Sequence, residues 1–172
     1  MIVSKNNFVI AVYVENKYGV LTRVTSMFTR RGFNIDTLTV GETESPEYSR
    51  ITISLSGDQT DRMQLVSQLK KLYNVKKVEV ITADKGIKRE LLLIKVKNDP
   101  ATRADIRDAI DVFRAKVVDY SAKAMCLEIT GDTNKIDAFI DNMKPFGIIE
   151  MCRTGIVAIE RGAGSLLNGE EE

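Results

Sequence analysis

One order of apolar spacings occurs twice along this chain, and it limits the possible folds more than any other feature. Apolar residues recur at every second position in a strand and at every third or fourth position in a helix. The first copy comprises a strand at Phe8–Val14, a helix at Val20–Phe28, a strand after Asn34, a strand at Arg50–Leu55, a helix with Met63, Val66, Leu69 and Tyr73 on its apolar face, and a strand at Val75–Ile81. This order predicts a ferredoxin-like βαββαβ unit with both helices on one face of an antiparallel sheet.

The second copy begins after a short polar break at Ala83–Lys88. It comprises an apolar strand at Leu91–Val96, a helical face at Ile106–Phe113, an alternating strand at Met125–Ile129, a helix at Ile136–Met143 and a final strand within Ile148–Ile159. The pair Gly131 and Asp132 repeats Gly57 and Asp58, and Asp58 is placed to cap the helix that follows. The predicted fold class is therefore α+β, with two tandem ferredoxin-like units.

The length of 172 residues allows one ordinary domain or two small ones of about 80 residues each, and the repeat favours two. We expect residues 1–83 to form a ligand-binding and dimerising domain. Residues 84–162 are expected to form a related C-terminal domain, and residues 163–172 a flexible acidic tail.

The composition disfavours several classes of function. A formal charge of +1 provides no general attraction for nucleic acid or an anionic membrane, and 6% aromatic residues are too few for an RNA-stacking sheet. The chain has no histidine, and its two cysteines, Cys126 and Cys152, are far apart, so we expect no metal site. No carboxylates are paired for acid–base chemistry, so no catalytic residue is assigned. No apolar run approaches the roughly 18 residues of a membrane span, and we expect a cytoplasmic protein.

A small-molecule site is predicted at the turn between the first strand and the first helix. Gly19 directly precedes the helix, whose first backbone N–H groups lack partners and carry the positive end of the helix dipole. A carboxylate would fit there, and glycine lets a ligand approach the backbone. Asn16 supplies an amide in the same turn. The alternative is that Asn16 and Gly19 are turn and cap residues only, chosen on conformational grounds.

Asn34 supplies a second amide, at the other end of the same helix. At 1.5 Å per residue the two ends are roughly 20 Å apart, so Asn16 and Asn34 can serve one small ligand only across a two-fold dimer. The second copy has Ala101 in place of Gly19. It also has Lys116 in place of Asn34, so only the first copy is expected to bind a ligand.

Two other groups of residues are given structural roles. Arg30 and Arg31 lie near the C-terminus of the first helix, where they complement its dipole, and we prefer this interpretation to a phosphate clamp. The methionines at helix or strand positions are expected in the core: Met27, Met63, Met125 and Met143.

A long motif covers the predicted site and its neighbours, and it reads ENKYGVLTRVTSMFTRRGFNIDTLTVG followed by SRITISLSGD. It continues through KRELLLIKV and FRAKVVDYS to CRTGIVAIERG, near the end of the chain. Together these stretches resemble the small regulatory subunits of acetolactate synthase, also called acetohydroxyacid synthase. The resemblance implies that residues 1–83 form an ACT domain, a domain that senses amino acids, and that a related domain follows.

The resemblance also implies a role in branched-chain amino-acid biosynthesis, the formation of valine, isoleucine and leucine. The chain would be non-catalytic alone and would activate a separate large subunit, which holds thiamine diphosphate and Mg²⁺. This chain would hold no cofactor. Valine would bind at the interface of an ACT-domain homodimer as a feedback inhibitor, next to Asn16, Lys17, Gly19, Val20 and Leu21 of one chain and Asn34 and Ile35 of the other.

The chain departs from the family at Tyr18, where the family usually has proline. Proline would fix the turn, whereas Tyr18 leaves it less rigid and is able to cover part of the site. The alternative function kept open is a free-standing amino-acid-sensing ACT protein that acts as a transcriptional co-regulator.

Overall fold

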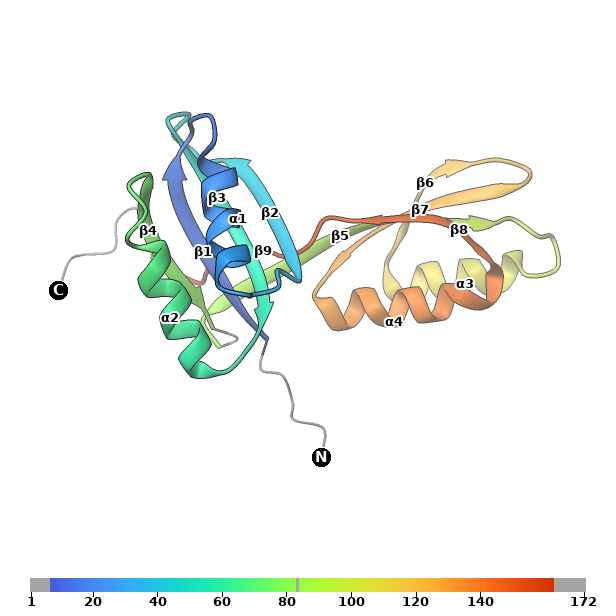
Figure 1. Ribbon diagram of the computed structural model, residues 1–172. Helices are drawn as coiled ribbons and strands as arrows, with labels where there is room; N and C mark the ends of the chain where they lie inside the picture. Colours follow the sequence, from blue (N-terminus) through green and yellow to red (C-terminus); the bar gives the residue numbers. More distant parts are fainter. Residues whose placement is uncertain (1–6, 83, 163–172) are drawn as a thin grey trace. The chain divides into compact units, whose positions relative to one another are not determined.

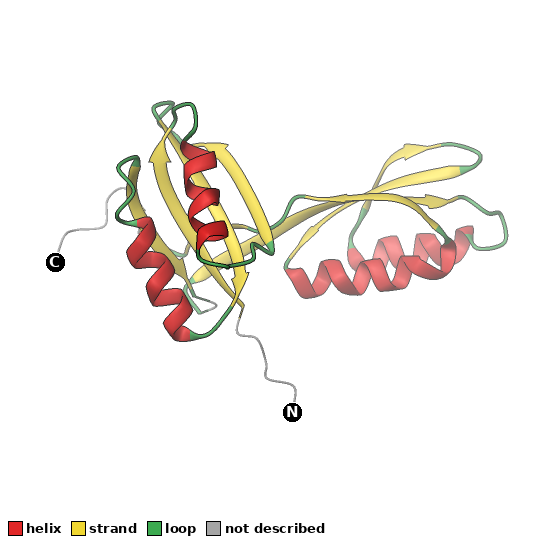
Figure 2. Ribbon diagram, in the orientation of Figure 1, coloured by secondary structure: helices red, strands yellow, loops and turns green. Residues whose placement is uncertain are grey.

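The computed structural model of the chain describes residues 7–82 and 84–162 (Figure 1). By their contacts the described residues form two units. One contains the residues up to Ile87 together with those from Ile156 onward, and the other spans Lys88–Gly155. Each unit is an antiparallel sheet with two helices on one face (Figure 2), which confirms the predicted α+β fold of tandem ferredoxin-like units. None of the described helices is long and apolar enough to cross a membrane.

The first unit follows the predicted order of elements. They are β1 (Asn7–Glu15), α1 (Val20–Arg30), β2 (Thr37–Glu42), β3 (Tyr48–Ser56), α2 (Gln59–Leu69) and β4 (Val75–Ile81). The strands are ordered β2-β3-β1-β4, so β2 and β4 are the edges of this sheet. Asp58 caps α2 as predicted, because its side chain accepts a hydrogen bond from the Asp61 N–H at 2.8 Å and the Asp61 carboxylate accepts one from the Asp58 N–H.

Strand β1 is buried on both faces, which explains why its sequence is apolar at nearly every position instead of alternating. On one face, residues such as Ile10 and Val12 point toward the helices and share a core with Val24 and Phe28 of α1. The other face of β1 packs against a short strand near the C-terminus, β9 (Val157–Glu160), through Val9, Ala11, Tyr13, Ile81 and Ala158.

Strand β9 is held on the first sheet by polar contacts as well. Arg50 Nη2 donates a hydrogen bond to the Ala158 carbonyl at 2.6 Å, and burial lowers the pKa of the Arg50 guanidinium. The final strand predicted within Ile148–Ile159 is therefore two strands with different locations, separated by Gly155 in the left-handed conformation (φ 85°). Both strands pair with β5 (Gly86–Lys97), but β9 also packs on the face of the first sheet.

The second unit has the same arrangement. Its elements are β5 (Gly86–Lys97), α3 (Arg103–Phe113), β6 (Lys116–Tyr120), β7 (Ala124–Gly131), α4 (Thr133–Met143), a short 3-10 helix (Lys144–Phe146) and β8 (Ile148–Arg153). The strands are ordered β6-β7-β5-β8, and β9 pairs with β5. The core lies between this sheet and its helices and includes Ile94, Ile106, Phe139 and Met143.

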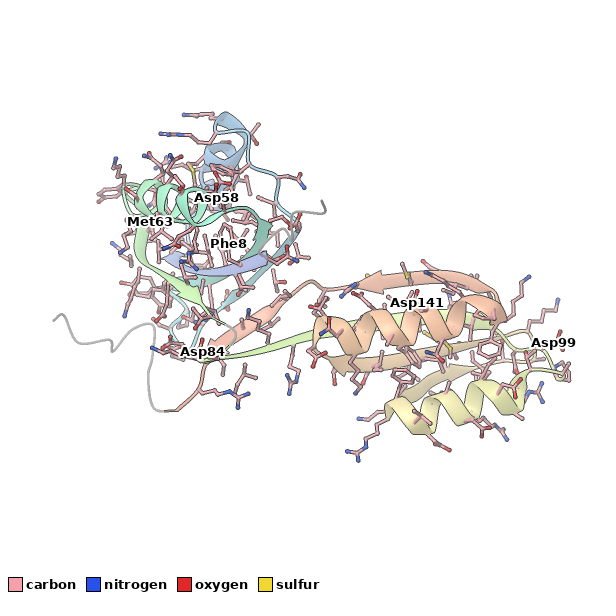
Figure 3. The ribbon with its side chains drawn as sticks, turned by 90° about the horizontal axis from the view of Figure 1, so that it is seen from below. Phe8, Asp58, Met63, Asp84, Asp99 and Asp141 are labelled. Atoms are coloured by element: carbon pink, nitrogen blue, oxygen red, sulfur yellow. The ribbon has the colours of Figure 1, made fainter. Side chains whose placement is uncertain are left out.

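The prediction that Met63 lies in the core is wrong. Met63 is 65% exposed and Tyr73, beyond the end of α2, is 82% exposed, while Leu65 and Leu69 are the buried residues of this helix. Figure 3 labels Met63 on α2. Two apolar series overlap in α2, and spacing alone did not select the series that ends in Leu69. The other three methionines agree with the prediction: Met125 and Met143 are buried, and Met27 packs against the first core.

Candidate ligand-binding site

The turn between β1 and α1 leaves backbone donors open. Gly19 is the N-cap residue of α1, in the left-handed conformation (φ 77°), and no side chain caps this helix end. A Cβ atom placed on Gly19 would meet nothing within 4 Å, so the backbone here borders open space. Among the described residues, the N–H groups of Gly19, Leu21 and Thr22 donate no hydrogen bond. The Val20 N–H donates to the Lys17 carbonyl at 3.3 Å.

The sequence prediction placed the anion-binding N–H groups at Gly19–Leu21. The structure brings these residues together with Asn16 and Lys17 in one turn, and adds the N–H of Thr22. Sequence reasoning missed Thr22, although the rule that the first four N–H groups of a helix lack internal partners would have found it. Tyr18 is fully exposed.

Asn16 is held by the loop between β2 and β3. Its Nδ2 donates to the Pro46 carbonyl at 3.0 Å and to Glu42 Oε1 at 3.3 Å, and its backbone N–H donates to the Glu47 carbonyl at 2.7 Å. Its Oδ1 accepts no hydrogen bond from the part of the chain that the structure describes. The amide is therefore oriented, and it has an acceptor free for a ligand ammonium group.

A network of charged side chains adjoins the turn. Glu15 forms ion pairs with Lys76 at 2.8 Å and Lys17 at 3.0 Å, and accepts a hydrogen bond from Asn74 Nδ2 at 2.8 Å. Lys76, then Asn74 and Lys17, lower the pKa of Glu15 to about 2, so this carboxylate is ionised at neutral pH. The ammonium of Lys17, one of the predicted ligand residues, thus contacts Glu15.

Asn34 and Ile35 lie beyond the other end of α1. Asn34 is exposed, and its Nδ2 is 3.5 Å from Asp36 Oδ1. Ile35 is partly buried against the first core. Since α1 has 11 residues, the two ends of the helix are separated by about 16 Å at 1.5 Å per residue. One chain therefore does not gather Asn16 and Asn34 around a single small ligand.

The turn is suited to recognition of a carboxylate. Three unpartnered N–H groups converge at the positive end of a helix, and the exposed side chain of Leu21 provides an apolar contact next to them. Within residues 7–82 and 84–162 there is no group of three or more His, Cys, Asp or Glu side chains placed to hold a metal ion.

Comparison with known proteins defines the class of each unit. The family model for "AHAS small subunit-like ACT domain" matches residues 10–77, and the model for "Small subunit of acetolactate synthase" matches residues 89–162. The first unit is thus of the ACT class, and the second is of the type that follows it in these proteins.

Whole-chain relatives narrow the class to one family. The chain is 49% identical to the probable acetolactate synthase small subunit of Archaeoglobus fulgidus, over 89% of this chain and 96% of that protein. It is 46% identical to the acetolactate synthase small subunit of Bacillus subtilis, over 90% of both. The crystal structure of the small subunit from Thermotoga maritima superposes with a TM-score of 0.86 at 38% identity, covering 92% of this chain and 99% of that one. The chain belongs to the acetolactate synthase small-subunit family.

Proposed function

We propose that this chain dimerises through its ACT domain, binds valine or a similar branched-chain amino acid at the dimer interface, and activates a separate acetolactate synthase large subunit. Membership of the small-subunit family supports the role in a holoenzyme. The observation that carries the amino-acid site is the set of unpartnered N–H groups at Gly19, Leu21 and Thr22. Thiamine diphosphate and Mg²⁺ belong to the large subunit in this proposal.

The ligand would be held by its two charged ends. Its carboxylate would accept hydrogen bonds from the open N–H groups of α1, where the helix dipole favours negative charge. Its ammonium group would donate to Asn16 Oδ1 and to the amide oxygen of Asn34 from the second chain. The aliphatic side chain would pack against Leu21 and the second chain's Ile35.

The first sheet offers an edge for the dimer. β2 is an edge strand of that sheet, and its Val40 is 43% exposed. A two-fold axis at β2 would reverse the direction of the second copy, so the N-terminal end of α1 in one chain would lie near the C-terminal end of α1 in the other. That geometry would bring Asn16 and Asn34 from different chains to one site. Feedback then requires only that valine favour one dimer geometry, a coupling of about 1–3 kcal/mol.

The alternative of a free-standing transcriptional co-regulator is not favoured. The relatives named as acetolactate synthase small subunits match this chain over 90% or more of their own length. A formal charge of +1 gives the chain no general attraction for a nucleic-acid partner.

Calorimetric titration of valine into the purified chain tests the site. We expect saturable heat and a rise in the thermal midpoint with valine concentration, because a ligand that binds only the folded state stabilises it by RT ln(1 + [L]/Kd). Aspartate is the control, since its second carboxylate would lie against the aliphatic side chains of Leu21 and Ile35. Absence of heat and of a thermal shift at millimolar valine would contradict the assignment. Assays with the large subunit would separately measure activation.

A further inference from the structure

A groove between α1 and the C-terminal end of α2 gathers four cations. It has a volume of about 230 Å³. Arg23, Arg30 and Arg31 line it from the α1 side, and Lys71 and Gln68 from the α2 side. None of the described lining residues is acidic.

The arginines share one face of α1 because residues four and seven or eight positions apart align along a helix. Arg30 and Arg31 lie at the C-terminal end, where the dipole favours cations. Arg23 lies in the first turn, where the dipole opposes a cation, so dipole complementation does not account for the cluster.

The four cations lack acidic partners. Of the ion pairs formed within the described residues, none involves Arg23, Arg30, Arg31 or Lys71. Arg23 Nη1 donates to Asn74 Oδ1 at 2.9 Å, and Asn74 is fixed in turn by its hydrogen bond to Glu15. The Arg23 guanidinium is thereby oriented, while its other N–H groups remain available. Like charges gathered in one groove repel one another until an anion enters.

The second unit shows that the fold does not require these charges. Its helices align with those of the first unit through their buried residues, Val24 with Ile106 and Leu69 with Met143. At the positions of the four cations the second unit has Asp105, Val112, Phe113 and Pro145. The same arrangement of helices thus forms without a cation at any of these four positions.

We propose that the groove between α1 and α2 binds a multivalent oxyanion, the chemical class of inorganic pyrophosphate and small molecules that carry a phosphate chain. Guanidinium groups bind oxyanions through paired, charge-assisted hydrogen bonds, and the Gln68 amide adds a neutral donor. Met27 and Leu72 provide apolar surface in the groove, which weakens competition by water. The small volume suits a compact anion better than a peptide segment. The groove shares no lining residue with the β1–α1 turn, so this proposal does not depend on the valine site.

Titration of the full-length protein with inorganic pyrophosphate at fixed ionic strength provides the test. The double variant Arg30→Gln/Arg31→Gln should bind at least about tenfold more weakly than the unmodified chain, because charge-assisted hydrogen bonds are lost. The matched control is Arg107→Gln/Lys123→Gln, which removes two exposed cations from the second unit and should leave the affinity unchanged. Thermal midpoints of both variants verify that they fold.

Two results would overturn the proposal. One is equal affinity, or equal loss of affinity, in the groove and control variants, which would mean that pyrophosphate responds to net charge alone. The other is no saturable binding of pyrophosphate at millimolar concentration, combined with weaker association of the groove variant with the large subunit. In that case the groove would hold acidic side chains of the partner protein.

Discussion

The two units share one fold, but equivalent residues at the turn after the first strand differ in burial and in hydrogen bonding. Asn98 of the second unit is the counterpart of Asn16, yet it is 3% exposed and fully bonded. Its Nδ2 donates to the Ser121 carbonyl at 2.6 Å, and its Oδ1 accepts from Arg103 Nε at 2.7 Å. Asn16 is exposed, with a free acceptor toward the solvent.

The backbone donors of the turn differ at one position. In the second unit the Ala101 N–H donates to Asp99 Oδ1 at 2.9 Å, and the Thr102 N–H donates to the Asp99 carbonyl at 3.2 Å. Figure 3 labels Asp99 in this loop, between β5 and α3. In the first unit the Val20 N–H, the counterpart of the Thr102 N–H, likewise donates to the Lys17 carbonyl at 3.3 Å, whereas the Gly19 N–H, the counterpart of the Ala101 N–H, forms no hydrogen bond within the described residues. The Asp99 side chain therefore occupies, in the second unit, the donor that the first unit leaves open at Gly19.

The largest expected effect is on the first turn. Gly19→Asp should abolish inhibition by valine while activation of the large subunit persists, since it places a carboxylate where the ligand carboxylate would lie. A Cβ atom has space at Gly19, so the cost to folding is the strain of a left-handed residue only. Enzyme assays with and without valine measure both properties. The matched change in the second unit, Ala101→Asp, should leave inhibition intact; if both variants lose it, the two turns do not differ as described.

The next largest effect is expected at a buried carboxylate of the second unit. Glu90 is 3% exposed, and it pairs with Arg153 and accepts a hydrogen bond from Thr133 Oγ1 at 2.5 Å. Replacing it leaves Arg153 without its buried partner, and Glu90→Gln should cost about 2–3 kcal/mol of unfolding free energy.

Urea unfolding followed by hydrogen exchange would locate that loss. Protection should fall mainly in residues 88–155. The control is Glu150→Gln, which removes the exposed pair with Lys95 and should change stability by less than about 1 kcal/mol. Similar losses for the two variants would mean that burial of Glu90 does not distinguish this site.

A smaller effect is expected where β9 covers the first sheet. Burial and then the charge of Glu160 raise the pKa of Glu79, while Lys77 and Arg50 act in the opposite sense. A raised carboxyl pKa means that the protonated form stabilises the fold at low pH, and that this contribution is lost as pH rises through the folded pKa. Glu79→Gln should therefore gain stability over the unmodified chain between pH 4 and pH 7, by less than about 1 kcal/mol. Thermal midpoints across this pH range measure it, and a constant difference would contradict the cause given.

Much of the fold follows from local patterns. The incorrect predictions concern residues whose burial or packing is set by tertiary contacts. The order of elements and the cap at Asp58 were predictable, because periodicity and capping act over a few residues. Burial of Leu65 in place of Met63 was not, since α2 has two apolar series and the sheet selects one. The packing of β9 on the first sheet depends on partners more than a hundred residues away in sequence.

The candidate site and the basic groove also differ in how far the sequence predicts them. Gly19 and its open N–H groups were predictable because helix ends have fixed chemistry. The basic groove was not, because Arg23 and Lys71 come together only when α1 and α2 pack side by side. From the sequence alone, the helix dipole is enough to explain Arg30 and Arg31.

The proposed valine site takes residues from two chains, and mixed dimers of two variants provide the test. Homodimers of Asn16→Ala or of Asn34→Ala lack one amide at every site. A heterodimer of the two variants has one site with both amides and one with neither. Since loss of a hydrogen-bonding partner costs about 1–3 kcal/mol, titration of the mixed sample with valine should show a fraction of sites with the affinity of the unmodified protein. Uniformly weakened binding in the mixed and homodimeric samples would contradict the shared site and confine any valine to a single chain.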